Sequence, residues 1–338
     1  MAEPFGTELF HSLERRRFAA LIGSAFLAAP FAAEAQPARI PRIGYLAPSL
    51  SPEASRLIAA FRQGLRELGY VEGQTIALEL RSAEGNPERF AGMAAELVAL
   101  NVDVIVAGAT LAVLPAEQAT RTIPIVFPVH TDPVGAGLVA SLARPGRNAT
   151  GLSFSSEDLT GKRMELLKET IPGVSRIAVL WKSPNPAALV QLKAAELAAR
   201  RLAVSLQVLE VRGAEDLESA FQAATQGASA ALLVVDDPAT FLLRKAIVEL
   251  AARSRLPAMY GPREFALDGG LMSYGANLED MFRRAATYVS KLLRGAKPAD
   301  LPVEQPTNFD FVINVKAAKA LGLSIPQSLL ARASEVLQ

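Results

Sequence analysis

Residues 124–154 read PIVFPVHTDPVGAGLVASLARPGRNATGLSF. The apolar run 125–129 predicts a buried strand. Asp132, followed by a proline, stands at an N-cap position and predicts a short helix. Arg-Pro-Gly at 144–146 ends that helix, and residues 149–154 predict another strand. Strands and helices alternate on both sides of this stretch, so we interpret it as the end of one α/β lobe and the connection into a second.

Composition narrows the class of protein. The chain has 338 residues, long enough for two domains, and 50% are hydrophobic but only 6% aromatic, which predicts cores of Ala, Leu and Val. The net charge is +1 and the basic residues are spread along the chain, so a nucleic-acid groove has no support. Cysteine is absent, which excludes disulfides, thiolate metal sites, cysteine nucleophiles and lipidation at cysteine.

The N-terminal segment 1–35 differs from the rest of the chain. Three arginines at 15–17 precede an apolar run of 15 residues, 19–33, and Ala-Glu-Ala at 33–35 fits signal peptidase. The run is shorter than the roughly 20 residues needed to cross a bilayer. We therefore expect a signal peptide, with the mature chain starting near Gln36. The arginine pair followed by x-Phe resembles a twin-arginine export signal, and a Sec signal is the alternative.

The remaining chain alternates short apolar runs with amphipathic segments. Predicted strands cover 42–47, 76–81, 102–107, 125–129, 149–154, 176–181, 204–211, 230–235, 258–260, 271–274 and 309–315. Predicted helices lie between most of them, including segments ending at Leu68, Leu100, Leu202 and Arg253, and the segment 278–293. This alternation favours parallel doubly wound sheets. The run 102–107 and its helix recur as 230–235 with a second helix, which indicates a two-lobe pseudo-repeat.

Ligands of such sheets lie outside the carboxyl ends of the strands, so the residues there are the candidate site. In the first lobe these are Ser49, Ser51, Ala109, Thr110, Thr131 and Asp132, and in the second Asn185, Asp236, Asp237, Tyr260 and Tyr274. We expect Thr110 and the amides at its helix N-terminus to bind a carboxylate. Asp236 or Asp237 would bind an ammonium, and Tyr260 would form an apolar wall. Helix capping explains Asp132 and Asn185 equally well, and core packing would explain Tyr260 and Tyr274.

Catalytic and cofactor motifs are weak. Residues 135–140 match G-x-G-x-x-A with Glu157 about 20 residues on, but five residues separate the strand from Gly135, so a dinucleotide site is disfavoured. No P-loop and no G-x-S-x-G elbow occurs, and His11 and His130 are the two histidines. Asp236 and Asp237 alone make a poor metal site. We therefore expect no catalysis, no metal and no cofactor.

Seven segments carry a resemblance to a known family. They are IGYL at 43–46, DPVGAGLV at 132–139, NATGLS at 148–153, GGLMSYG at 269–275, RRAATYV at 283–289, GAKPADLPVEQP at 295–306 and NVKAAKALGL at 314–323. Together they resemble ABC-transporter substrate-binding proteins of the tryptophan/tyrosine (TrpX-like) type, from Ile40 to the end of the chain.

The resemblance implies a periplasmic-binding-protein type I fold with two Rossmann-like lobes and three interlobe crossovers. We expect the crossovers near 150–154, 274–277 and 304–308. The corresponding domain boundaries place 36–152 plus 277–304 in lobe 1 and 153–276 plus 305–338 in lobe 2.

The resemblance also implies a function. We expect a periplasmic, monomeric solute-binding protein that closes by a hinge on a small ligand, an aromatic or branched amino acid being one candidate, and delivers it to an ABC permease and its ATPase. It would not bind nucleic acid, would meet the membrane only through the permease, and would diffuse freely, since it lacks the lipid-anchoring cysteine of many relatives. The alternatives are a periplasmic sensing module for a signalling partner and a secreted enzyme.

Overall fold

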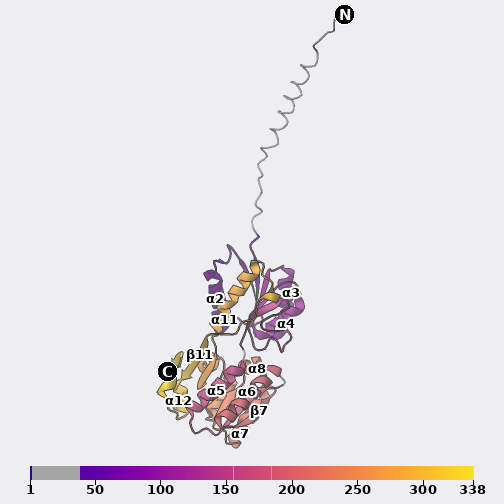
Figure 1. The fold of residues 1–338 in the computed structure, drawn as a ribbon. Coiled ribbons are helices and arrows are strands. Elements are labelled where there is room, and N and C mark those ends of the chain that lie inside the picture. Colours follow the sequence, from indigo (N-terminus) through magenta and orange to yellow (C-terminus); the bar gives the residue numbers. More distant parts are fainter. Residues whose placement is uncertain (2–38, 155, 184) are drawn as a thin grey trace. The chain divides into compact units, whose positions relative to one another are not determined.

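The computed structural model describes residue 1 and residues 39–338, apart from residues 155 and 184. The predicted signal peptide therefore lies outside the described residues. Residues 40–338 contain two sheets flanked by helices (Figure 1).

Lobe 1 is built on a five-stranded sheet in the order β2-β1-β3-β4-β5, and every pair in it is parallel. Its strands are β1 (Arg42–Ala47), β2 (Ala77–Ser82), β3 (Val104–Ala107), β4 (Ile125–His130) and β5 (Ala149–Ser153).

Lobe 2 is built on a seven-stranded sheet in the order β12-β11-β10-β9-β8-β6-β7. Its strands are β6 (Arg176–Lys182), β7 (Ser205–Val211), β8 (Ala231–Val234), β9 (Ala258–Tyr260), β10 (Met272–Ala276), β11 (Phe309–Asn314) and β12 (Glu335–Leu337). The sheet is parallel except for β10 and β11, which run antiparallel with Ala276 opposite Phe309. The predicted parallel doubly wound architecture is confirmed, and β10–β11 is an antiparallel pair within it. The chain leaves β10 and enters β11 at the same edge of the sheet, so the two strands must run in opposite directions.

Helices cover both faces of each sheet. In lobe 1, α2 (Pro52–Glu67) and α11 (Leu278–Leu293) pack side by side on one face, and α3 (Phe90–Ala99) and α4 (Thr110–Ala119) cover the other (Figure 1). In lobe 2, α5 (Ser156–Thr170), α6 (Pro186–Leu202) and α12 (Val315–Ala320) share one core. The opposite face carries α7 (Leu217–Gln226), α9 (Arg244–Arg253) and the short helix α10 (Arg263–Leu267). Two short helices, α8 (Pro238–Leu242) and α13 (Gln327–Leu330), and the 3-10 turns η1 (Pro87–Arg89), η2 (Ala214–Asp216) and η3 (Pro298–Asp300) complete the elements.

Helix α2 illustrates why these segments fold as they do. Ser51 caps it, its hydroxyl accepting a hydrogen bond from Ala54 N–H at 3.3 Å, and proline follows in the first helical position. Phe61 and Leu65 are buried beneath it against β1 and α11, and burial of each such side chain contributes about 1.5–3 kcal/mol. Gly64 lets the two helices approach, because a Cβ there would lie 2.2 Å from the backbone oxygen of Arg283.

Three segments connect the two sheets, and hydrogen bonds join them to one another. Ser153 N–H donates to the Glu304 carbonyl at 2.9 Å, and Glu304 N–H donates to the Gly151 carbonyl at 3.1 Å. Asn277 N–H donates to the Asn308 carbonyl at 3.0 Å. The crossings therefore form a small ladder of their own between the lobes. The domain boundaries given above, which fall in these segments, remain our proposal.

The helix predicted after Asp132 does not form. Residues 133–140 make a succession of turns instead, and Gly137 adopts a φ of +70°. Leu138 and Val139 both donate to the Pro133 carbonyl, at 3.0 and 3.2 Å, a pattern that closes wider turns than the α-helix does. The predicted helix ending at Arg253 is also interrupted, since α8 and α9 meet at Leu243.

Candidate functional site

The carboxyl edge of the lobe 1 sheet gathers the candidate residues of that lobe. Strands β1, β3 and β4 end at Ala47, Ala107 and His130, and because they are parallel their following loops lie along one edge. Those loops carry Ser49, Ser51, Ala109, Thr110, Thr131 and Asp132. The structure thus brings all of them to one edge.

The two serines have structural partners. The Ser51 hydroxyl caps α2, and the Ser49 hydroxyl accepts from Ser51 N–H at 3.3 Å. Both residues are half-buried. Their hydroxyls shape the loop after β1, and the N–H groups at the start of α2 are partly used by this cap.

The N-terminus of α4 is different. Its N-cap is Ala109, with the extended backbone usual for that position (φ −153°, ψ 153°) but no side-chain hydrogen bond to the helix. Thr110 is the first helical residue, and both residues are half-buried. A helix N-terminus carries unpaired N–H groups and a partial positive charge, which suit a carboxylate. This helix end is therefore the part of the lobe 1 edge that is best prepared for an anion.

Asp132 shapes the turn after β4. Its Oδ1 accepts from Gly135 N–H at 2.7 Å, and its own N–H donates to Nδ1 of His130 at 3.1 Å. Burial lowers the pKa of His130 to about 4, although the charge of Asp132 acts in the opposite direction. His130 is therefore neutral, with its proton on Nε2. A Cβ on Gly135 would lie 2.0 Å from Asp132 Oδ2, so a glycine at this position leaves room for the Asp132 carboxylate. This packing explains the glycine without a dinucleotide-binding site.

In lobe 2, Asn185 and Asp237 meet at the carboxyl edge. Asn185 follows β6, Asp237 follows β8, and the Asn185 side-chain amide donates to Oδ2 of Asp237. Asp237 Oδ1 accepts from Ala239 N–H at 2.6 Å and so caps α8. A carboxylate offers about four acceptor positions, so these two bonds leave room for another donor.

Asp236 has different partners from Asp237. Its Oδ2 lies 2.7 Å from Nη2 of Arg163, and both side chains are almost completely buried. Gln191 holds its backbone from both sides, accepting from Asp236 N–H at 3.0 Å and donating to its carbonyl at 2.8 Å. The charge of Asp236 is already compensated inside the protein, so it is a poor receptor for a ligand ammonium.

Sequence reasoning missed Arg163. Its position gave a signal, because it lies four residues after Leu159 and four before Leu167, two apolar residues on the buried face of α5. A charged residue in such a stripe needs a buried partner. The local pattern could not say that this partner is Asp236, 73 positions further along the chain.

The two tyrosines occupy different surroundings. Tyr260 is 0% exposed and stacks on Phe265 with 4.6 Å between ring centroids, and burial raises its pKa well above the usual range. It packs in the core, which favours the core-packing alternative over a wall of the ligand site. Tyr274 is half-buried, stacks on Phe309 with centroids 5.9 Å apart, and its carbonyl accepts from Nε of Arg163 at 2.7 Å. It lies at the second crossing.

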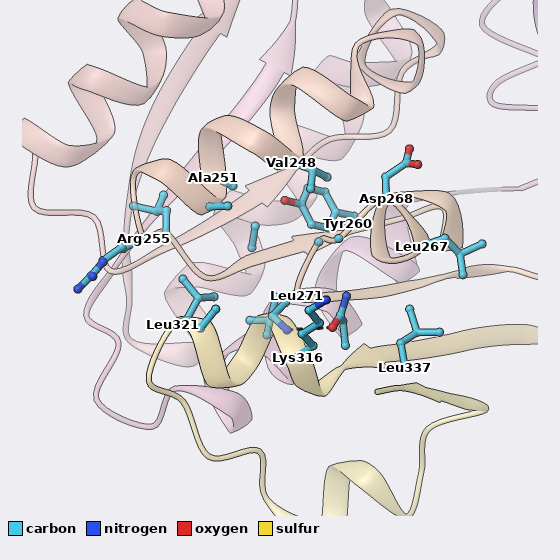
Figure 2. A pocket seen from close by; sticks show the side chains of 18 of the residues that line it. Val248, Ala251, Arg255, Tyr260, Leu267, Asp268, Leu271, Lys316, Leu321 and Leu337 are labelled. Atoms are coloured by element: carbon cyan, nitrogen blue, oxygen red, sulfur yellow. Dashed lines mark hydrogen bonds between the residues drawn. The ribbon is translucent and has the colours of Figure 1, made fainter.

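Two pockets lie near lobe 2. The larger, of about 580 Å³, is bounded by α9, α12, the loop 268–271 and Leu337 (Figure 2). Ala258 and Leu271, at the amino ends of β9 and β10, contribute to its lining. Tyr260 is the one candidate residue that lines it, and the other candidate residues lie elsewhere. The smaller, of about 170 Å³, is lined by residues of both lobes, namely Pro52, Arg56, Arg244, Glu264, Leu267 and Asp268. Burial raises the pKa of Glu264 there, against the opposing effect of Arg263, Arg56 and Arg244.

Within residue 1 and residues 39–338 as described, no group of three or more His, Asp or Glu residues could hold a metal ion. In that same part of the chain no helix is both long enough and apolar enough to cross a membrane.

Comparisons with known proteins agree with the fold. The model of the family described as "ABC transporter substrate binding protein" matches residues 50–337. A tyrosine-binding protein of Clostridioides difficile (strain R20291) is 25% identical over 273 residues, which are 80% of this chain and 78% of that protein. An ABC domain from Streptococcus pneumonia, solved in complex with L-Trp, has a TM-score of 0.79 at 29% identity and covers 88% of this chain and 99% of its own. A conserved domain protein from Vibrio cholerae has a TM-score of 0.79 at 30% identity, covering 88% and 100%.

Proposed function

The chain belongs to the ABC transporter substrate-binding protein family, and we propose that it binds an amino acid, preferably an aromatic one, outside the cytoplasm and delivers it to a membrane permease. The similarity to the L-Trp-bound domain, over nearly the whole length of both chains, carries this proposal. The tyrosine-binding relative supports the same ligand class. The signal sequence predicted in residues 1–35 supports the location. The protein would bind and release its ligand without chemistry.

The ligand carboxylate is assigned to the N-terminus of α4. Ala109 leaves the first N–H groups of this helix without a side-chain cap, whereas Ser51 and Asn277 cap α2 and α11. A carboxylate there replaces the missing cap and interacts favourably with the helix dipole, by roughly 0.3–1 kcal/mol for the dipole alone and more for each charge-assisted hydrogen bond.

The ammonium is assigned to Asp237. Of the two adjacent carboxylates, Asp236 is paired with Arg163 while Asp237 accepts from two neutral donors, the Asn185 amide and Ala239 N–H. Among the residues that the structure describes, none forms an ion pair with Asp237, so its negative charge can pair with a ligand cation. Lobe 1 would hold one end of the amino acid and lobe 2 the other, so binding favours closure about the three crossings.

Calorimetry on protein freed of co-purified ligand tests the proposal. We expect L-tyrosine or L-tryptophan to bind, and the corresponding amine without a carboxylate, tyramine or tryptamine, to bind at least about tenfold more weakly, because one charge-assisted bond is worth about 1.5–3 kcal/mol. If none of the common L-amino acids binds, the proposed ligand class is wrong.

A variant pair tests the assignment of the carboxylate. Ala109→Asp supplies a cap that also repels an anion, and Ala109→Asn supplies a similar cap without charge. Both should raise stability by about 0.5–2 kcal/mol, since Asp and Asn are preferred N-caps. Ala109→Asp should lose the most affinity, and Ala109→Asn less. Unchanged affinity in both variants would move the carboxylate away from α4.

A further inference from the structure

Arg163 joins two parts of lobe 2 that are distant in sequence. It lies on α5, the first helix after the chain crosses from lobe 1, and its exposed fraction is 1%. Its Nη2 lies 2.7 Å from Asp236 Oδ2, beside the start of α8. Its Nε donates to the carbonyl of Tyr274 at 2.7 Å, in the last strand before the chain returns to lobe 1. One guanidinium thus contacts both the ligand-facing edge and a crossing strand.

The surroundings leave this connection little freedom. A Cβ on Gly261 would lie 1.9 Å from Asp236 Oδ1 and 2.6 Å from Arg163 Nη2. A Cβ on Gly275 would lie 2.5 Å from the carbonyl oxygen of Gly261. Two glycines therefore allow β9 and β10 to close over the ion pair, and Gln191 fixes the Asp236 backbone from the other side.

A contribution to stability alone does not explain why Arg163 and Asp236 form a buried ion pair. A buried ion pair is often no more stabilising than apolar residues of similar volume, because desolvation offsets the Coulombic attraction. A lysine would supply the same charge. The guanidinium, however, donates a hydrogen bond from Nε to the Tyr274 carbonyl while its Nη2 lies 2.7 Å from Asp236 Oδ2, and a single ammonium cannot occupy both positions. The arrangement therefore depends on the shape of the Arg163 side chain as well as on its charge.

We propose that Arg163 is a positioning residue that fastens the start of α8 to the second crossing strand, so that the ligand-facing edge of lobe 2 moves with the hinge as one rigid body. One consequence of this inference rests on the proposed function: the fastening keeps Asp237 correctly placed relative to lobe 1 when the lobes close. The fastening itself is a property of the ligand-free protein.

The test uses variants that separate fastening from stability. Arg163→Leu combined with Asp236→Asn removes both charges and the bridge, and we expect most of the stability to be retained. Arg163→Lys keeps the positive charge and loses the planar guanidinium that contacts both partners. The matched control is Glu169→Gln with Arg332→Leu, which removes a partly exposed ion pair, 2.9 Å long, between the end of α5 and the residue Arg332 after α13. Each variant is compared with wild type by amide hydrogen exchange without ligand and by titration with L-tyrosine and L-tryptophan.

We expect faster exchange confined to residues 237–240 and 274–277 in the double variant and in Arg163→Lys, with no such change in the control. Affinity should fall by about tenfold or more in the two Arg163 variants, beyond any loss in the control. Wild-type exchange in both segments for Arg163→Lys and for the double variant would overturn the proposal. So would local loosening accompanied by unchanged affinity. If wild type itself binds no amino acid, the proposed function fails, and the exchange result still decides the fastening.

Discussion

Replacement of His130 by Asn should remove much of the acid sensitivity of the protein. His130 is 4% exposed, and its Nδ1 accepts a hydrogen bond from Asp132 N–H. Asn places an acceptor oxygen close to the position of Nδ1 but does not titrate. The variant therefore keeps the local bond and loses the protonation equilibrium.

The magnitude follows from the pKa of His130, which burial lowers from 6.5 to about 4 in the folded chain. Above pH 6.5 histidine is neutral in both the folded and the unfolded state, so it contributes no pH dependence. As the pH falls from 6.5 towards 4, the unfolded chain binds a proton that the folded chain excludes, and the free energy of unfolding decreases. At about 1.4 kcal/mol per pH unit, the loss is roughly 2 kcal/mol at about pH 5 and approaches about 3 kcal/mol below pH 4.

Urea unfolding of residues 36–338 at about pH 7.5 and about pH 5 measures this effect. Other groups titrate over the same range, but their contribution cancels when the pH-induced loss is compared between wild type and variant. We expect the variant to lose about 2 kcal/mol less than wild type. Equal losses in the two proteins would mean that His130 protonates normally in the folded state, and the inferred burial of a neutral imidazole would be wrong.

Two other predictions concern packing and motion. Gly64→Ala should lower stability by about 1–3 kcal/mol, because its Cβ would lie 2.2 Å from the Arg283 carbonyl oxygen, whereas Gly92→Ala on the exposed side of α3 should raise it by about 0.5–1 kcal/mol. Thermal unfolding of both variants would show these opposite signs, and a loss in both would point to a backbone effect unrelated to the α2–α11 contact. Small-angle scattering should show a smaller radius of gyration when saturating L-tyrosine or L-tryptophan is added. An unchanged radius at demonstrated saturation contradicts closure.

The sheets could be predicted well from sequence because their signal is local. The run 230–235 is continuously apolar, the run 102–107 is apolar except for Asp103, and both contain strands buried on two faces. The segment after Asp132 failed because its cap and proline indicate a helix start, while Gly135 and Gly137 favour turns and the carboxylate fits over the first of them. Local propensities therefore pointed to both outcomes.

The candidate site was predicted only in part. Placement of the residues at strand ends follows from topology, which the alternation of elements revealed. Pairing of Asp236 with Arg163 and burial of Tyr260 on Phe265 are tertiary contacts, and no spacing in the sequence encodes them. An expected ligand contact and an internal ion pair use the same residue types, so the sequence alone could not separate them.

The position of α11 has a consequence for how the protein is made. Its buried side chains Met281, Phe282, Ala285, Tyr288 and Val289 complete the core beneath α2, although the chain forms β6 to β10 of lobe 2 before it reaches them. During synthesis, the first five strands would leave the ribosome long before the helix that covers one of their faces. Truncation before residue 293 should leave that face exposed to water and prone to association. Lobe 1 therefore cannot finish folding as an independent N-terminal domain, and both lobes are completed only when the last third of the chain has emerged.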